Sequence, residues 1–309
     1  MSVAPARTGR GQHPERSQPM HTILLSAGFG LVTASILALA GVGMSLQFSV
    51  TNFVNFAYGD YATMGAYLAL FAVHKHLPIV GAAAVSGLAM ALLSLLIYRV
   101  VFRSFVRQRS RNVTLLIVSV GVSLALQGTI SAIWGSGFQT YQLNVQSPLH
   151  IGPFQLTLQQ ILIIAIAALA LAGVHALLRY TIIGKTMRAM SDNKDLAEVS
   201  GINTTRVTDL TWLLSGLLVG IAGVVLAINT SSFTPLLGTQ FLFLVFAGVI
   251  LGGIGRIYGA MLGALIIGMS TEIASPYVGA AYADAAAFVI MILILLIRPS
   301  GIFAAKGKA

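Results

Sequence analysis

The sequence predicts an all-α polytopic membrane protein, and three observations support this fold class. Hydrophobic residues make up 57% of the 309 positions and charged residues only 8%, whereas soluble proteins carry about 25% charged residues. The charged residues also leave long gaps: none lies between Arg16 and Asp60, within residues 112–178, or within residues 210–255. A helical span needs about 20 mostly apolar residues, so each of the last two gaps has room for two spans.

The first apolar segment, Thr22–Phe48, is expected to be a membrane helix and not a cleaved signal peptide. It is longer than the apolar core of a signal peptide and is followed by more apolar chain. Residues 1–20 contain Arg7, Arg10 and Arg16 among Pro, Gly, Ser and Gln. This composition predicts a disordered cytoplasmic tail.

Nine apolar segments are candidate membrane spans: Thr22–Phe48, Thr51–Val73, Leu77–Tyr98, Val113–Trp134, Leu158–Leu178, Leu210–Ile228, Gly238–Gly255, Ile257–Ser275 and Ala280–Ile297. Lys and Arg gather in the N-terminal tail, in loop 99–111, in loop 179–206 and at the C-terminal end. The positive-inside rule assigns these four places to the cytoplasm. The loops 135–157 and 229–237 contain no charged residue and are expected to face outward.

The same clusters predict the domain organisation. Residues 21–299 form one membrane domain with a long cytoplasmic loop at 179–208, and residues 300–309 form a cytoplasmic C-terminal tail. Both chain ends are therefore expected in the cytoplasm. Nine full spans cannot connect two cytoplasmic ends, because the number of crossings would have to be even.

The segment Thr51–Val73 is the weakest of the nine candidate spans. It contains Asn52, Asn55, Gly59 and Asp60, and polar residues or glycines in an apolar stretch indicate a broken or re-entrant helix. The sequence thus predicts eight spans plus one broken or re-entrant segment. The alternative is an incorrect assignment of the segment after it or of the N-terminal tail.

Glycine-rich interruptions occur in both halves of the chain, at Asn55–Gly65 and at Gly248–Gly263. Transporters often place broken helices at corresponding positions of two repeats, close to the substrate path. This leads to the hypothesis of two pseudo-repeated halves, although small residues also allow close helix packing. The candidate residues of a translocation path or hinge are Asn55, Tyr58, Gly59, Asp60, Gly65, Gly252, Gly253 and Gly255.

Asp60 lies inside an apolar stretch, where an ionised carboxylate costs about 2.5–3.5 kcal/mol on insertion scales. The functional interpretation is a residue of a substrate pathway or hinge. The structural interpretation is an N-cap for a half-helix that starts at Tyr61, with the carboxylate accepting backbone N–H bonds. The sequence leaves both open.

The loop 179–208 contains a predicted short helix that is capped by Ser191 or Asp192 and continues to Ser200. The spacing of Asp192, Asp195 and Glu198 gives this helix one acidic face, and Gly201 provides its C-terminal stop. Such a helix in a cytoplasmic loop is either a docking element for another protein or a solvated connector.

No constellation of an enzyme appears in the sequence. There is no cysteine, no H-E-x-x-H motif and no Walker A lysine, so any ATP hydrolysis must come from another chain. We expect no metal site and no cofactor. The net charge of +10 lies at the ends of apolar segments, which the positive-inside rule explains without nucleic-acid binding.

Several motifs, in order along residues 22–303, resemble those of the high-affinity branched-chain amino acid ABC permease family. Residues 54–67, V-N-F-A-Y-G-D-Y-A-T-M-G-A-Y, resemble the family motif N-F-A-H-G-E followed by x-x-M-L-G-A-Y. Tyr58 and Asp60 replace the common His and Glu. Further similar stretches are Lys194–Asn203, Ala247–Gly263 and Arg298–Phe303.

The resemblance implies one of two homologous permease subunits of an ATP-driven importer in a bacterial plasma membrane. Two cytoplasmic ATPases would dock on the segment Asp192–Asn203, and an extracytoplasmic binding protein would deliver the substrate. The implied coupling residues are Asp192, Asp195, Ala197, Glu198 and Gly201. Urea and amide permeases share these motifs, so a urea or short-chain amide importer is the alternative. An ion-coupled secondary transporter would leave the docking segment unexplained, and an intramembrane enzyme would lack catalytic pairs.

Overall fold

The computed structural model describes residues 19–108, 111–143, 148–151, 154–299 and 301–303. Most of the predicted N-terminal tail and of the C-terminal tail lies outside these residues. The elements are α1 (Pro19–Thr51), α2 (Tyr58–His74), α3 (Ile79–Ile97), the π-helical turn η1 (Tyr98–Phe102), α4 (Arg103–Arg107), α5 (Asn112–Trp134), β1 (Leu149–Ile151), β2 (Phe154–Leu156), α6 (Leu158–Tyr180), α7 (Ile182–Asp192), α8 (Lys194–Val199), α9 (Thr204–Thr230), α10 (Leu237–Gly252), α11 (Ile257–Val278), the 3₁₀ turn η2 (Ala280–Tyr282) and α12 (Ala283–Ile297).

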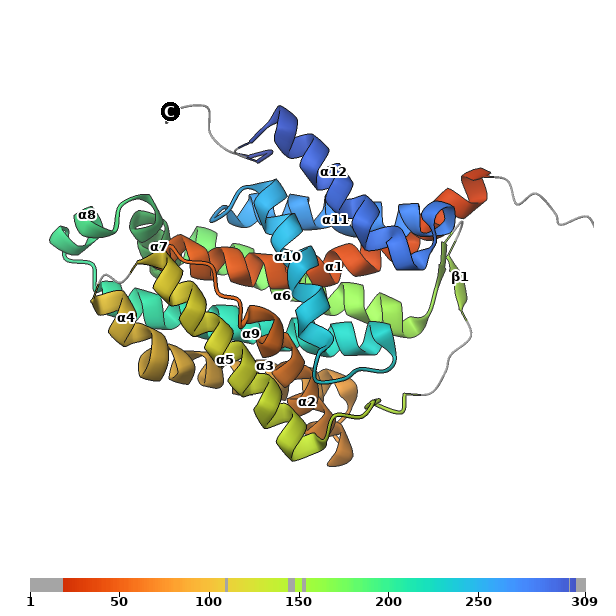
Figure 1. Cartoon of the computed structure of the whole chain (residues 1–309), viewed down its shortest axis with the longest axis horizontal. Helices are drawn as coiled ribbons and strands as arrows, with labels where there is room; N and C mark the ends of the chain where they lie inside the picture. The colour runs from red at the N-terminus through yellow and green to blue at the C-terminus, as the bar shows by residue number, and fades with distance from the viewer. Residues whose placement is uncertain (1–18, 109–110, 144–147, 152–153, 300, 304–309) are drawn as a thin grey trace, which may run out of the picture.

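The fold is an all-α polytopic membrane protein, as the sequence predicted. Within the described residues, seven helices are long and apolar enough to cross a membrane, and they correspond to seven of the nine predicted segments. The other two segments form the short helices α2, of 17 residues, and α10, of 16 residues. The strands β1 and β2 form a small antiparallel hairpin beside α1 (Figure 1).

Each short helix follows a non-helical stretch. Residues 52–57 precede α2, and residues 231–236 precede α10. The interruption predicted in the first half is therefore real. Its counterpart is residues 231–236 and not the predicted Gly248–Gly263, because that run forms the end of α10, a turn and the start of α11.

The two ends of the described chain lie at opposite ends of the bundle. The N-terminal part of α1 lies beside the β1–β2 hairpin, whereas its C-terminal end lies near α7 (Figure 1). The C-terminal segment is held at that second end, since the Ile302 N–H donates to the Leu251 carbonyl at 2.9 Å and the neighbouring Gly255 packs on Phe48 of α1. The two described ends thus lie at opposite ends of the bundle, whereas the sequence analysis expected both termini on the cytoplasmic side. Packing along α11 fixes the direction of α1 within the bundle.

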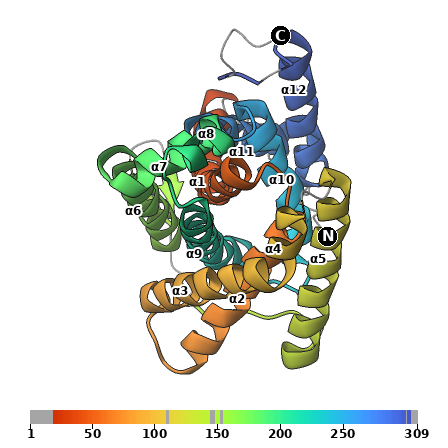
Figure 2. The ribbon, with the colours of Figure 1, turned by 90° about the vertical axis from the view of Figure 1, so that its left-hand side faces the viewer.

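The centre of the bundle is formed by α1 and α9, with α3, α5, α6 and α12 towards the outside (Figure 2). Trp212 of α9 is fully buried and stacks on Tyr98 of η1, with ring centroids 4.8 Å apart. Arg99 of the same turn forms an ion pair with Asp209 at 2.6 Å. These contacts fix the C-terminal end of α3 against α9, and α2 packs on both of these helices.

Candidate functional site

The non-helical residues 52–57 are held in place by side chains. Asn55 is 2% exposed; its Oδ1 accepts from the Ala57 N–H at 3.1 Å, and its Nδ2 donates to Gln47 Oε1 at 3.2 Å. The Phe56 N–H donates to Ser119 Oγ of α5 at 3.1 Å. Non-helical backbone is tolerated at membrane depth only where protein or water satisfies its polar groups. These hydrogen bonds provide protein partners for polar groups of residues 52–57.

Asp60 connects three helices at the start of α2. Its carboxylate accepts hydrogen bonds from Ser123 Oγ and, at 2.9 Å, from Gln127 Nε2, both on α5. Gln127 Nε2 also lies 3.4 Å from Thr239 Oγ1 in the first turn of α10. The residue is 2% exposed, and its place in the first turn of α2 is favourable for a negative charge.

The capping interpretation of Asp60 is wrong. The helix begins at Tyr58 and not at Tyr61, its N-cap residue is Ala57, and no side chain caps it. Asp60 therefore uses its carboxylate between helices, where it holds α2 to α5.

The two partners of Asp60 were missed by the sequence analysis. Ser123 and Gln127 are four residues apart in an apolar segment without charges, and this spacing places them on one face of a helix. That spacing was the available signal. It could not show which helix the polar face meets.

The starts of α2 and α10 touch through glycines. A Cβ atom on Gly59 would lie 2.2 Å from the Gly238 carbonyl oxygen, and one on Gly238 would lie 1.9 Å from the Gly59 oxygen. Thr63 Oγ1 accepts from the Gly238 N–H at 2.8 Å. The two short helices thus meet at their N-terminal ends, which agrees with the placement of paired half-helices in transporters.

We expect Gly59→Ala to destabilise the protein by several kcal/mol, because the added methyl group overlaps the backbone of α10 and overpacking costs about 1–3 kcal/mol or more. The measurement is the amount and melting temperature of detergent-solubilised protein. Gly128→Ala on α5 is the matched control, since nothing lies within 4 Å of its added methyl group. Equal behaviour of both variants would contradict the close contact.

Other predicted site residues serve packing and turns. Tyr58 is 1% exposed, and its hydroxyl lies where a side chain on Gly43 of α1 would begin. Gly65 packs on Gly220 of α9, where a Cβ atom would lie 2.7 Å from the carbonyl oxygen. The structure therefore places Tyr58 and Gly65 in the core around the Asp60 segment.

The glycines after α10 form a separate group at the other end of that helix. Gly252 packs on Gly259 of α11, where a Cβ atom would lie 2.0 Å from the carbonyl oxygen. Gly253 and Gly255 have φ angles of 102° and 80°, which favour glycine. They form the tight turn between α10 and α11 and lie apart from the Gly59–Gly238 contact.

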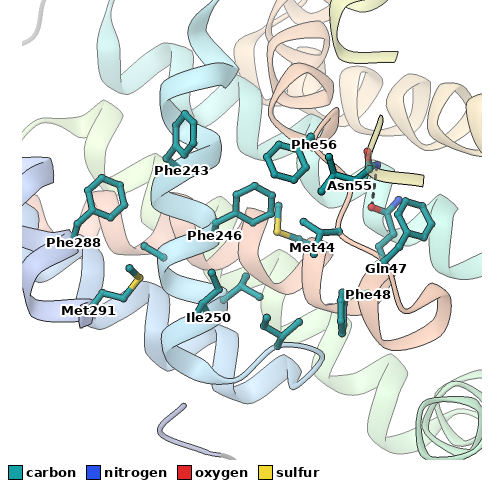
Figure 3. A pocket seen from close by; sticks show the side chains of 16 residues that line it. Met44, Gln47, Phe48, Asn55, Phe56, Phe243, Phe246, Ile250, Phe288 and Met291 are labelled. Atoms are coloured by element: carbon teal, nitrogen blue, oxygen red, sulfur yellow. Dashed lines mark hydrogen bonds between the residues drawn. The ribbon is translucent and has the colours of Figure 1, made fainter. Parts of the chain in front are cut away.

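A pocket of about 390 Å³ opens beside the non-helical segment (Figure 3). It lies between α1, residues 53–56, α10 and α12. Its walls carry rings and thioethers from Phe48, Phe56, Phe246, Phe288, Met44 and Met291. The hydrogen-bonded pair Gln47 and Asn55 lies at one side of it. The pocket is thus apolar with one polar side.

The loop predicted to be cytoplasmic contains two short helices and not one. The helix α7 ends at Asp192, and Asn193 caps α8 by accepting from the Leu196 N–H at 2.9 Å. The predicted cap at Ser191 or Asp192 is therefore wrong, because the chain becomes extended at Asn193. The predicted stop at Gly201, which has a φ of 84°, is confirmed.

The surface of α8 is partly apolar. Asp195 and Glu198 are exposed and Ala197 is buried, whereas Asp192 is the last residue of α7 and is separated from α8 by the extended Asn193. The single acidic face predicted for all three acids is therefore absent. Leu196 is 64% exposed and Val199 is 88% exposed, a feature that the sequence analysis did not select.

The family model described as branched-chain amino acid transport system / permease component matches residues 26–297. The chain belongs to this family. Among similar permeases, it is 29% identical over 287 residues to the high-affinity branched-chain amino acid transport system permease protein LivH of Escherichia coli. The aligned residues cover 88% of this chain and 92% of that protein.

Two further relatives are also named as branched-chain amino acid transport permease proteins. The permease protein BraD of Pseudomonas aeruginosa is 28% identical over 287 residues, with 88% of this chain and 93% of that protein covered. The probable LivH of Methanocaldococcus jannaschii is 29% identical over 295 residues, with 90% and 91% covered. The resemblance inferred from the motifs is confirmed.

Proposed function

We propose that this permease-family chain forms part of the translocation path of an ATP-driven importer for branched-chain amino acids. The observation that carries the proposal is the match of the permease family over residues 26–297. The apolar, aromatic pocket beside Asn55 supports an aliphatic substrate over urea, because urea has no apolar body to fill such a pocket.

In this proposal the translocation path includes Asn55, Gly59 and Asp60. The non-helical residues 52–57 and 231–236 provide the hinges at which the half-helices α2 and α10 reorient between outward and inward states. Gly252, Gly253 and Gly255 are assigned to a second hinge between α10 and α11. Tyr58 and Gly65 provide the rigid packing around the moving ends.

The partners in this proposal are a homologous second permease subunit, two cytoplasmic ATPases and an extracytoplasmic binding protein. The ATPases dock on α8 and its flanks through Asp192, Asp195, Ala197, Glu198 and Gly201. The exposed Leu196 and Val199 support this assignment, because apolar side chains on a polar helix surface mark interaction sites.

The orientation in the plasma membrane follows from the coupling assignment. If α7 and α8 face the cytoplasm, the loop 135–157 and the start of α1 face outward, and the C-terminal end faces inward. The seven long helices and the two interrupted segments then give nine crossings. This number is odd, because a chain whose two ends lie on opposite sides of the membrane crosses it an odd number of times.

Cysteine labelling tests this orientation in a chain without native cysteines. We expect cysteines at Gln142, Thr230 and Ser17 to react with a membrane-impermeant maleimide added to intact cells, and a cysteine at Asn193 to react only after lysis. The Ser17 variant discriminates between the two orientations of α1. Labelling of Asn193 from outside would contradict the proposed topology.

Import into proteoliposomes tests the function itself. The chain is co-purified with its native partner subunits, and the ATP-dependent uptake of radiolabelled leucine, isoleucine, valine and urea is measured with the binding protein outside. We expect uptake of the three amino acids and none of urea. Uptake of urea alone would replace the proposal with its alternative.

A further inference from the structure

The non-helical residues 52–57 are attached to α9 and η1 by aromatic rings. Phe53 of this segment is 3% exposed, and its ring centroid lies 5.3 Å from that of Phe102 in η1 and 6.4 Å from that of Trp212 in α9. The rings of Phe102 and Trp212 also touch, with centroids 5.3 Å apart, and Tyr98 stacks on Trp212 at 4.8 Å. Contacts of this kind add to the energy of apolar burial. We call these four residues the aromatic cluster.

Two polar contacts hold the walls of the aromatic cluster together. The ion pair of Arg99 with Asp209, at 2.6 Å, joins η1 to α9. The Ser94 hydroxyl donates to the Trp212 carbonyl at 3.2 Å and joins α3 to the same turn of α9. Phe102 and Trp212 are fully buried. Protein interiors are close-packed and transmit strain, so a displacement of α9 at this level also displaces the rings that touch it.

The helix α9 begins shortly after α8, the helix that is assigned to ATPase docking. Only residues 200–203 lie between the two helices, and Asn203 caps α9 by accepting from the Arg206 N–H at 3.0 Å. Trp212 lies about two helical turns after the start of α9 at Thr204. A movement of α8 therefore has a short and continuous helical connection to the aromatic cluster.

The direct route from the loop to residues 52–57 is less closely packed. A polar hollow of about 400 Å³ lies between residues 49–52 at the end of α1 and residues 190–194 at the junction of α7 and α8. Side chains that border such a space lack the contacts through which a displacement is passed on. The ring contacts between α9 and Phe53 are therefore the better mechanical connection.

We propose that the aromatic cluster couples the ATP-driven movement of α8 and α9 to the reorientation of residues 52–57, with Phe53 and Trp212 as positioning residues. A displacement of α9 moves Trp212, the ring of Trp212 moves that of Phe53, and Phe53 carries the segment in front of α2. The inference rests on the proposed function and adds to it the residues that connect the docking helix with the hinge.

The ratio of leucine imported to ATP hydrolysed tests the proposal. A loss of folded protein lowers both rates together and leaves this ratio unchanged, whereas a loss of coupling lowers the ratio. The chain is reconstituted with its native partners in proteoliposomes, and both rates are measured with leucine-loaded binding protein. We expect Phe53→Leu and Trp212→Leu, which remove a ring and keep the site apolar, to lower the ratio at least about fivefold. Trp212→Phe is expected to retain it, because a phenyl ring can still pack on Phe53 and Tyr98.

Trp134→Leu is the matched control. Trp134 is the other tryptophan of the chain and packs at the C-terminal end of α5 on Tyr67, with ring centroids 5.4 Å apart. We expect this variant to keep the ratio of the unchanged chain. If Trp212→Leu does not assemble, the ratios of Phe53→Leu and Trp212→Phe decide the outcome.

Two results would overturn the coupling role and leave the proposed function standing. One is an unchanged ratio with Phe53→Leu, and the other is an equal fall of the ratio with Trp134→Leu. Absence of ATP-dependent leucine uptake by the unchanged chain would instead overturn the proposed function, and the coupling role with it.

Discussion

Replacement of Leu196 and Val199 together by glutamate is expected to abolish ATP-dependent transport while the permease still inserts into the membrane. Both side chains are exposed on α8, at 64% and 88%, so the fold does not depend on them. Apolar anchors at the centre of an interface contribute about 2 kcal/mol or more each. Burial of two new carboxylates against a partner would lower its affinity by at least about 100-fold.

The measurement is co-purification of the ATPases with the tagged permease, together with leucine uptake. Gln108→Glu is the control, because it adds a carboxylate at an exposed position after α4 on the same side of the molecule. We expect this control to retain both assembly and uptake. Full ATPase recovery with the double variant would show that α8 is a solvated connector, the alternative that the sequence left open.

Asp60→Asn is expected to reduce transport at least about tenfold, a barrier increase of about 1.4 kcal/mol, with little change in the amount of inserted protein. The amide can still accept from Gln127 Nε2, and the Ser123 hydroxyl can rotate to accept from the new N–H. The variant therefore preserves the contact between α2 and α5 and removes the charge alone. That charge is suited to the ammonium group of an amino acid.

Two further variants separate charge from packing. Asp60→Leu removes the side-chain acceptor of the Ser123 hydroxyl and one of the two acceptors near Gln127 Nε2. It is expected to lower the yield as well, since a buried unpaired donor costs about 1–3 kcal/mol. Asp284→Asn, at an exposed acid of α12, is expected to leave uptake unchanged. If Asp60→Asn reduced uptake and inserted protein in equal proportion, only a structural role for the carboxylate would remain.

The pairing of the two interruptions illustrates what residue patterns cannot provide. The sequence around Asn55 contains enough polar residues and glycines to reveal a broken helix. The second interruption, residues 231–236, is also polar, but it lies between two apolar segments and so looks like an ordinary outward loop. The contact between Gly59 and Gly238 makes it the counterpart, and that contact joins residues 179 positions apart.

The direction of α1 was also beyond the sequence analysis. Three arginines in the tail indicated a cytoplasmic start, but the positive-inside rule describes a bias summed over all loops. Two cytoplasmic ends require an even number of crossings, which conflicts with nine spans. The sequence analysis resolved this conflict by treating Thr51–Val73 as re-entrant. The structure instead places the start of α1 and the C-terminal segment at opposite ends of the bundle.

By itself, the sequence determined membrane residence, the nine apolar segments, the family and the break near Asp60. These features depend on composition and on local spacing, which a linear pattern records completely. Only the tertiary structure decided that Asp60 binds Ser123 and Gln127, that Asn193 separates α7 from α8, and that Gln47 binds Asn55. Each of these features depends on which faces of separate helices and loops meet, and close packing in three dimensions decides which faces meet.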